Sequence, residues 1–182
     1  MSIKKLLIAN RGEIAVRIAG AAAELGIETV AIYSDDDSAS LHTRKTDHRV
    51  GLGKNGVAAY LDGATVINIA SEQGCDAIHP GYGFLAENAN FVRQCDVAGI
   101  VFVGPDADVL DLFGDKAKAR TLAEQCGVPV IEGTSGATTL AGVKDFYTSL
   151  GSDAAVMIKA LAGGGGRGMR AVECFEDLDE AY

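Results

Sequence analysis

The sequence predicts an α/β fold, in which a parallel, helix-flanked sheet is followed by a second unit of a different design. Apolar runs of strand length alternate with stretches of helical periodicity over the first hundred residues. Near residue 160 two strand-like runs flank a glycine run, which favours an antiparallel hairpin. The length of 182 residues allows one medium domain, or a small domain with part of a second.

The first part of the chain predicts five strands with helices between them. The strand-like runs span residues 3–9, 28–33, 48–52, 75–79 and 100–103, and an acidic turn follows the second at 35–37. Helical spacing covers residues 13–25, 64–73 and 87–98. Strands separated by helices favour a parallel sheet, whose ligands usually bind beyond the carboxyl ends of the strands.

A boundary is expected around residues 110–117. Beyond it the pattern predicts a helix over 115–126, an extended segment over 128–132, a loop over 134–139 and a helix over 143–150. The hairpin strands follow at 154–161 and 169–174. Residues 176–182 begin a helix for which no stop signal follows, so we expect the chain to continue beyond Tyr182.

The loop after the first strand does not fit a dinucleotide site. A GxGxxG pattern is missing, since only Gly12 is present, and Glu13 would repel a pyrophosphate. A dehydrogenase of the Rossmann type is therefore disfavoured. A Walker A loop is excluded as well, because the chain contains no GxxxxGK[ST] pattern.

The glycine run is the stronger phosphate-binding candidate. Four successive glycines, Gly163, Gly164, Gly165 and Gly166, have no β-carbons, so their backbone N–H groups can approach phosphate oxygens closely. Lys159 ends the apolar strand that precedes them and could hold its ammonium beside a phosphate. The alternatives are a merely flexible hairpin tip and a solvated lysine. Lys116, in the first turn of a predicted helix, is a second candidate.

Composition and charge exclude other classes. The formal net charge of −9 and the scattered Lys and Arg do not predict a nucleic-acid partner. No apolar run approaches the roughly 18 residues of a membrane span. The four cysteines are far apart with no histidine at metal-ligand spacing, so we expect reduced thiols, no metal site made from them, and a cytoplasmic location.

Five motifs in order resemble those of biotin carboxylases, the ATP-using components of biotin-dependent carboxylases such as acetyl-CoA and propionyl-CoA carboxylase. They are IANRGEIA at residues 8–15, HPGYGFLAEN at 79–88, Gly104-Pro105, Gly114-Asp115-Lys116 and the lysine–polyglycine stretch from Lys159. The resemblance covers essentially the whole chain, and HPGYGFLAEN is its most specific part. It implies a Rossmann-like (pre-ATP-grasp) domain over residues 1–113 that binds no dinucleotide. Residues 114–182 would then begin an ATP-grasp domain.

The resemblance also implies chemistry. ATP with Mg²⁺ would phosphorylate bicarbonate to carboxyphosphate, which supplies CO₂ to biotin on a carrier. Lys116 and Lys159 would contact ATP phosphates, Gly163–Gly166 would close over them, and Met169 would border the adenine. Tyr82 and Glu87 would lie on the biotin side, although loop packing and a helix-start charge explain them equally well. The family's magnesium carboxylates, bicarbonate-binding groups and acid–base glutamate are expected beyond Tyr182. We therefore place no catalytic residue in this chain and expect no turnover from it alone.

The expected partners are biotin carboxyl carrier and carboxyltransferase domains or subunits. A homodimer through the first helix is open, because Arg17 and Glu24 match the family pattern whereas Gly20 stands where arginine is common. Two alternatives remain: another ATP-grasp ligase, such as a carbamoyl-phosphate synthase relative, and a non-catalytic module that binds nucleotide or assists assembly. The sequence leaves the final carboxyl acceptor open among acetyl-CoA, propionyl-CoA, pyruvate, urea and others.

Overall fold

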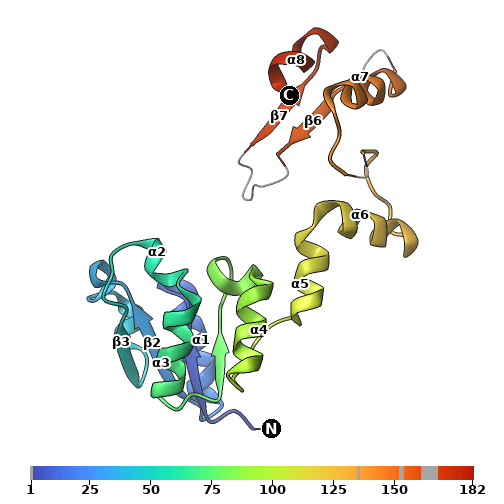
Figure 1. Ribbon diagram of the computed structural model, residues 1–182. Helices are drawn as coiled ribbons and strands as arrows, with labels where there is room; N and C mark the ends of the chain where they lie inside the picture. The colour runs from blue at the N-terminus through green and yellow to red at the C-terminus, as the bar shows by residue number, and fades with distance from the viewer. Residues whose placement is uncertain (1, 135, 152–153, 161–167) are drawn as a thin grey trace. The chain divides into compact units, whose positions relative to one another are not determined.

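The computed structural model describes residues 2–134, 136–151, 154–160 and 168–182, which form two compact units, Met1–Gly114 and Asp115–Tyr182 (Figure 1). The α/β fold class is confirmed. In unit 1 the elements are β1 (Lys5–Ile8), α1 (Gly12–Glu24), β2 (Glu28–Tyr33), η1 (Asp35–Asp37), η2 (Leu41–Arg44), β3 (His48–Gly51), α2 (Val57–Tyr60), α3 (Gly63–Glu72), β4 (Ala77–His79), η3 (Phe84–Glu87), α4 (Ala89–Val97), β5 (Val101–Phe102) and α5 (Ala107–Gly114), where η marks a 3₁₀ turn.

The sheet of unit 1 is parallel throughout and has the order β3-β2-β1-β4-β5. Side chains alternate between its faces, because successive residues of a strand point in opposite directions. Leu6 and Ile8 of β1 pack with α1, and Leu7 packs into the larger cluster that α3 and α4 cover. Helices thus cover both faces (Figure 1), which buries most of β1, β2 and β4 and agrees with their apolar sequences, whereas the edge strand β3 is largely exposed.

Side-chain caps decide where two of these helices begin. Asp62 accepts from the Thr65 N–H at 3.1 Å and starts α3, and Asn88 accepts from the Phe91 N–H at 3.0 Å and starts α4. The predicted helix 87–98 was therefore wrong at its start: Glu87 ends the 3₁₀ turn η3 instead. The short elements η2 and α2 and the helix α5 were not predicted.

Unit 2 contains a hairpin and helices. Its elements are α6 (Lys116–Gln125), α7 (Leu140–Ser149), β6 (Val156–Lys159), β7 (Met169–Val172), η4 (Phe175–Asp177) and α8 (Leu178–Ala181). The antiparallel pairing of β6 with β7 confirms the predicted hairpin. Tyr147, Val172 and Leu178 form a small buried core. Residues 128–132 lie in neither a helix nor a strand.

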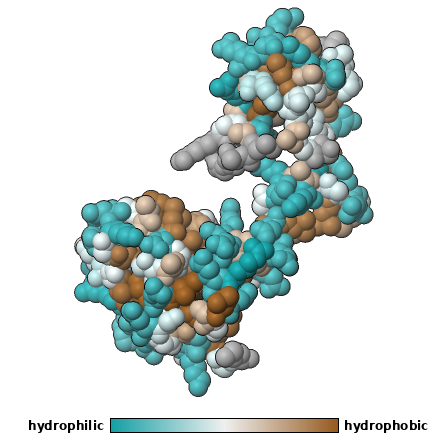
Figure 2. Space-filling view, viewed as in Figure 1, coloured by the Kyte–Doolittle hydropathy of each residue, from teal (hydrophilic) through white to brown (hydrophobic). Residues whose placement is uncertain are grey.

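On the face that Figure 2 shows, hydrophilic residues are interspersed with hydrophobic ones in both units. Within the described residues, no helix combines the length and apolar character needed to cross a membrane.

Candidate functional site

The centre of the sheet in unit 1 brings the two N-terminal motifs together. Strands β1 and β4 are neighbours, while the chain continues from β1 to β2 on the other side. The loops after β1 and β4 therefore leave the sheet in opposite directions. Open α/β sheets bind ligands in the crevice between two such loops, beyond the carboxyl ends of the strands. IANRGEIA includes the end of β1 and HPGYGFLAEN begins with the last residue of β4. Two motifs far apart in sequence thus share one edge of the sheet.

Asn10 joins the two loops. Its side chain is 3% exposed, and its Nδ2 donates to the carbonyl oxygens of Pro80 at 2.7 Å and Tyr82 at 2.9 Å. Its Oδ1 accepts from the Arg11 N–H at 2.9 Å. Each polar atom of this buried side chain is therefore satisfied.

The turn that Asn10 holds presents Tyr82. Gly81 and Gly83 on either side have φ of +67° and +63°, a conformation that favours glycine. The Tyr82 side chain is 64% exposed, and its hydroxyl donates to Oε2 of Glu13 at 3.3 Å. Glu87 is exposed at the end of η3. The Tyr82 hydroxyl thus contacts α1 rather than Glu87.

His79 supports the same turn. Its Nδ1 accepts from the Gly81 N–H at 3.0 Å, so the neutral ring carries its proton on Nε2. Burial lowers the pKa of His79. The ring therefore stays neutral near pH 7 and holds the N–H of Gly81 within the turn.

A carboxylate in the 3₁₀ turn η1, which follows β2, already has hydrogen-bond and ionic partners. Asp37 accepts from the hydroxyls of Tyr60 at 2.8 Å and Ser40 at 2.9 Å, and its Oδ2 lies 3.6 Å from Nε of Arg11. Burial alone would raise the pKa of Asp37, but these hydrogen bonds and the guanidinium outweigh it, so the pKa lies below its usual range. A dinucleotide fold uses an acidic group near this strand end to bind ribose. Here Asp37 instead links Arg11, Ser40 and Tyr60, which belong to separate segments of unit 1.

In unit 2 the hairpin register pairs Lys159 with Met169. They are Cα partners at the end of the strands that the connecting loop joins, and the Ala160 N–H donates to the Gly168 carbonyl at 2.9 Å. Val156 and Val172 face the small core, so Lys159 and Met169 lie on the opposite, exposed face with Met157. The residues Gly163, Gly164, Gly165 and Gly166 lie outside the described residues.

Lys116 opens α6. The preceding Asp115 caps this helix, its Oδ1 accepting from Ala117 N–H at 2.9 Å and Lys118 N–H at 3.1 Å. These backbone hydrogen bonds, that of Lys118 foremost, lower the pKa of Asp115. Tyr82 and Glu87 belong to unit 1 and Lys116, Lys159 and Met169 to unit 2, so the structure describes each set within its own unit.

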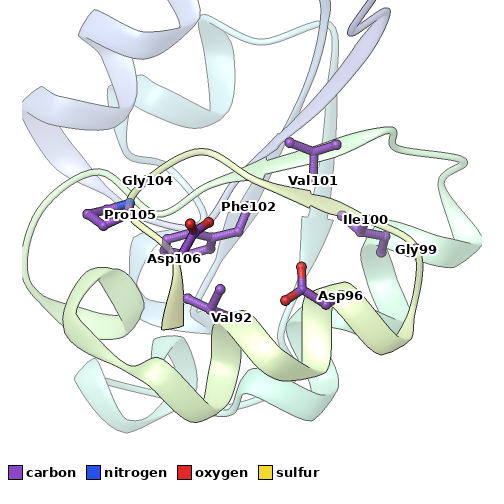
Figure 3. A pocket seen from close by; sticks show the side chains of 9 residues that line it. All are labelled: Val92, Asp96, Gly99, Ile100, Val101, Phe102, Gly104, Pro105 and Asp106. Carbon is purple, nitrogen blue, oxygen red and sulfur yellow. The ribbon is translucent and has the colours of Figure 1, made fainter. Parts of the chain in front are cut away.

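A pocket of about 320 Å³ lies elsewhere, along the edge strand β5. It is lined by Val92, Asp96, Gly99, Ile100, Val101, Phe102, Gly104, Pro105 and Asp106 (Figure 3). None of the predicted site residues lines it. In the described part of the chain, no group of three or more His, Cys, Asp or Glu side chains could hold a metal ion.

Two features of the site were missed at the level of sequence. Asn10 stands inside a recognised motif, and its position directly after a buried strand was a usable signal for a buried amide. The contact of Asp37 with Arg11 had no such signal, because the two residues meet only once the loops after β1 and β2 are placed side by side.

Two family models match this chain, one in each unit. Residues 2–110 match the model described as "Biotin carboxylase, N-terminal domain", and residues 115–182 match "Carbamoyl-phosphate synthase L chain, ATP binding domain". Pyruvate carboxylase of Bacillus subtilis (strain 168) is 53% identical over 184 residues, covering 100% of this chain and 16% of the relative.

Two solved structures show the same architecture. The biotin carboxylase domain dimer of Hydrogenobacter thermophilus 2-oxoglutarate carboxylase, in complex with MgADP, ADP and bicarbonate, is 42% identical with a TM-score of 0.93, covering 100% of this chain and 41% of that one. Campylobacter jejuni biotin carboxylase in a β,γ-ATP complex is 41% identical with a TM-score of 0.94, covering 99% and 40%. The chain thus spans 16% of the curated relative and about two fifths of these structures.

Proposed function

This chain belongs to the biotin carboxylase family, and from that premise we propose that it works within an ATP-dependent biotin carboxylase of a biotin-dependent carboxylase. Residues 1–113 would form the N-terminal domain and 114–182 the first part of the ATP-grasp domain. The reaction would use ATP with Mg²⁺ to activate bicarbonate and carboxylate biotin on a carrier. The identity to pyruvate carboxylases favours pyruvate as the final acceptor, which a carboxyltransferase would select.

The observation that carries the nucleotide-binding part is the hairpin of unit 2. Lys159 and Met169 are cross-strand partners on the exposed face, at the end of the strands that leads into the glycine run. A cation beside a flexible apolar side chain suits a phosphate and an adenine ring respectively. We assign Lys159, Lys116 and the backbone of Gly163, Gly164, Gly165 and Gly166 to the phosphates and Met169 to the adenine.

Magnesium does not fit the described residues. No group of three or more His, Cys, Asp or Glu side chains among them could hold the ion, so no step is derived through the metal here. Tyr82, exposed at the switch point of the sheet, suits a biotin-facing role. Glu87 is assigned to the same side, supported by its exposure and its place five residues later in the same motif.

A lysine substitution tests the nucleotide site. In a protein that contains this chain, Lys159→Ala should weaken ATP binding roughly ten- to hundredfold, as expected when a charge-assisted hydrogen bond is lost. Lys144→Ala is the matched control, because Lys144 is also in unit 2 but pairs with Asp179 at 2.7 Å. Titration calorimetry with ATP measures both. Equal affinities in the two variants would contradict the assignment.

A substrate test separates the alternatives. A biotin carboxylase should hydrolyse ATP in a bicarbonate-dependent reaction that free biotin stimulates. A carbamoyl-phosphate synthase relative would show no biotin stimulation, and a non-catalytic module would bind nucleotide without hydrolysis. The match of residues 2–110 to biotin carboxylases favours the first outcome.

The proposed partners are biotin carboxyl carrier and carboxyltransferase domains or subunits. A homodimer through α1 is also proposed: Arg17 is exposed on this helix with Glu24, and one structural relative is described as a dimer. Gly20, also exposed, offers no side chain to such an interface. The cytoplasmic location stays a prediction.

A further inference from the structure

Asn10 directs both of its hydrogen-bond donors at one turn. Both protons of its Nδ2 are directed at backbone carbonyls on either side of Gly81, at 2.7 and 2.9 Å. Its Oδ1 is fixed by the Arg11 N–H, which settles the orientation of the amide. The joining of β1 to β4 does not need these bonds, because the Ala9 N–H already donates to the His79 carbonyl at 2.9 Å.

The turn is shaped around this amide. A β-carbon on Gly81 would lie 2.8 Å from Nδ2 of Asn10, closer than real β-carbon contacts, and 3.1 Å from Cγ1 of Ile14, which is a tight contact. The Gly81 N–H is held from the other side by Nδ1 of His79. Backbone and amide therefore fit each other closely, and Tyr82 follows directly from this fixed point.

We propose that Asn10 is a positioning residue that holds the turn Pro80–Tyr82 so that Tyr82 presents its ring to biotin. This inference rests on the proposed function, which supplies biotin as the substrate. Asn10 is buried and acts through the carbonyls of Pro80 and Tyr82. Glu13 completes the arrangement by accepting from the Tyr82 hydroxyl at 3.3 Å. Removing the amide donors would release the turn without removing Tyr82.

Asn10→Asp is the sharpest variant, because it keeps the size of the side chain and the acceptor for Arg11 N–H. It replaces the NH₂ group with an oxygen that faces two carbonyl oxygens. Burial and these oxygens would raise the pKa of the new carboxyl group, and its protonated form could again donate one hydrogen bond. The defect should therefore be large at high pH and smaller at low pH.

The other charged or ionisable groups at this place are shared with the wild type. They are Arg11 and Glu13 at the start of α1 and His79 at the end of β4, with Asp37 beyond Arg11. Dividing KM for biotin in the variant by KM for biotin in the wild type at each pH removes the contribution of these shared groups. Asn90→Asp is the matched control, since it makes the same change at an exposed position of α4 in the same unit.

The experiment measures steady-state kinetics with free biotin and with ATP, from pH 6.5 to 8.5, in the carboxylase that contains this chain. Asn10→Asp should raise KM for biotin about tenfold at pH 8.5, the size of one lost hydrogen bond, and less at pH 6.5. KM for ATP should stay within about twofold, and Asn90→Asp should match the wild type. An unchanged KM for biotin, or equal rises for biotin and ATP, would overturn the proposal.

Hydrogen exchange on the same protein separates this inference from the proposed function. The amides of residues 81–83 should exchange faster in Asn10→Asp than in the wild type or Asn90→Asp. Unchanged exchange would overturn the positioning role even if the enzyme carboxylates biotin. A wild-type protein without biotin-dependent activity would instead contradict the proposed function, and with it biotin as the substrate. In that case the exchange rates alone would decide whether Asn10 holds the turn.

Discussion

At the scale of single residues, His42 shows how burial can make a side chain sensitive to acid. Its ring is fully buried in η2, which contacts α1 and β2. Nε2 donates to the Ile32 carbonyl at 3.2 Å, and Nδ1 has no partner among the described residues. Burial, the largest influence, lowers the pKa of His42, so the folded protein keeps this ring neutral.

The lowered pKa predicts a loss of stability in mild acid. The unfolded chain binds a proton at His42 more readily than the folded protein does. The free energy of unfolding is therefore at its full value above the unfolded pKa of about 6.5 and decreases as the pH falls below it. The slope contributed by one such group is at most about 1.4 kcal/mol per pH unit. His42→Gln keeps an amide donor for Ile32 but cannot titrate. Urea unfolding between pH 5 and 7.5 should give a shallower pH dependence for this variant, and an identical slope would contradict the prediction.

Gly81 is the second residue whose replacement has a defined physical cost. Gly81→Ala places a β-carbon at φ of +67° and against Asn10, whereas Gly53→Ala places one at φ of +64° with nothing within 4 Å. Both should lose about 1 kcal/mol from left-handed strain, and Gly81→Ala should lose more. Urea unfolding of the two variants measures the difference. Equal losses would show that the Asn10 amide yields without cost.

At the scale of elements, the cap of α4 explains both a correct and a wrong expectation. The apolar spacing of Phe91, Val92 and Cys95 predicts the helix, and all three are buried. The same pattern extends back to Glu87, but Asn88 turns its side chain onto the Phe91 N–H and starts the helix afterwards. Spacing reports which face is buried, and it does not report where a side chain competes with the backbone for hydrogen bonds.

The cap makes a testable contribution to stability. Asn88→Ala should lower the free energy of unfolding by about 1 kcal/mol, because the Phe91 N–H loses its acceptor. Asn88→Asp keeps an acceptor oxygen at the same place and should lose little. Denaturant unfolding of the two variants compares them directly, and an alanine variant as stable as the aspartate variant would show that water replaces the cap.

At the scale of the molecule, strand order is what assembles the switch-point site. The sequence predicts the strands, the parallel sheet and the order of the motifs, because buried parallel strands are continuous apolar runs. It does not predict that Asn10 and Pro80, seventy positions apart, meet through one hydrogen bond. That contact depends on β1 and β4 being neighbours, a property of the whole sheet. The hairpin pairing of Lys159 with Met169, by contrast, is local and follows from the two strands alone.

The two units also differ in the size of their cores, and that difference should be measurable. Unit 2 buries only Tyr147, Val172 and Leu178 in its described residues, while unit 1 buries two extensive clusters. The stabilisation from burial grows with the apolar area removed from water. Amides of β6 and β7 should therefore exchange through openings of lower free energy than those of β1 and β4.

A single hydroxyl tests whether that small core depends on specific contacts. The Tyr147 hydroxyl lies 2.9 Å from the Ala154 carbonyl and 2.7 Å from that of Glu173, so it links the segments that enter β6 and leave β7. Tyr147→Phe keeps the ring and removes these contacts, leaving the two carbonyls to find other partners. It should speed amide exchange in β6 and β7, with the amides of β1 as the internal reference. Unchanged exchange in β6 and β7 would show that the packing of the Tyr147 ring alone holds the hairpin.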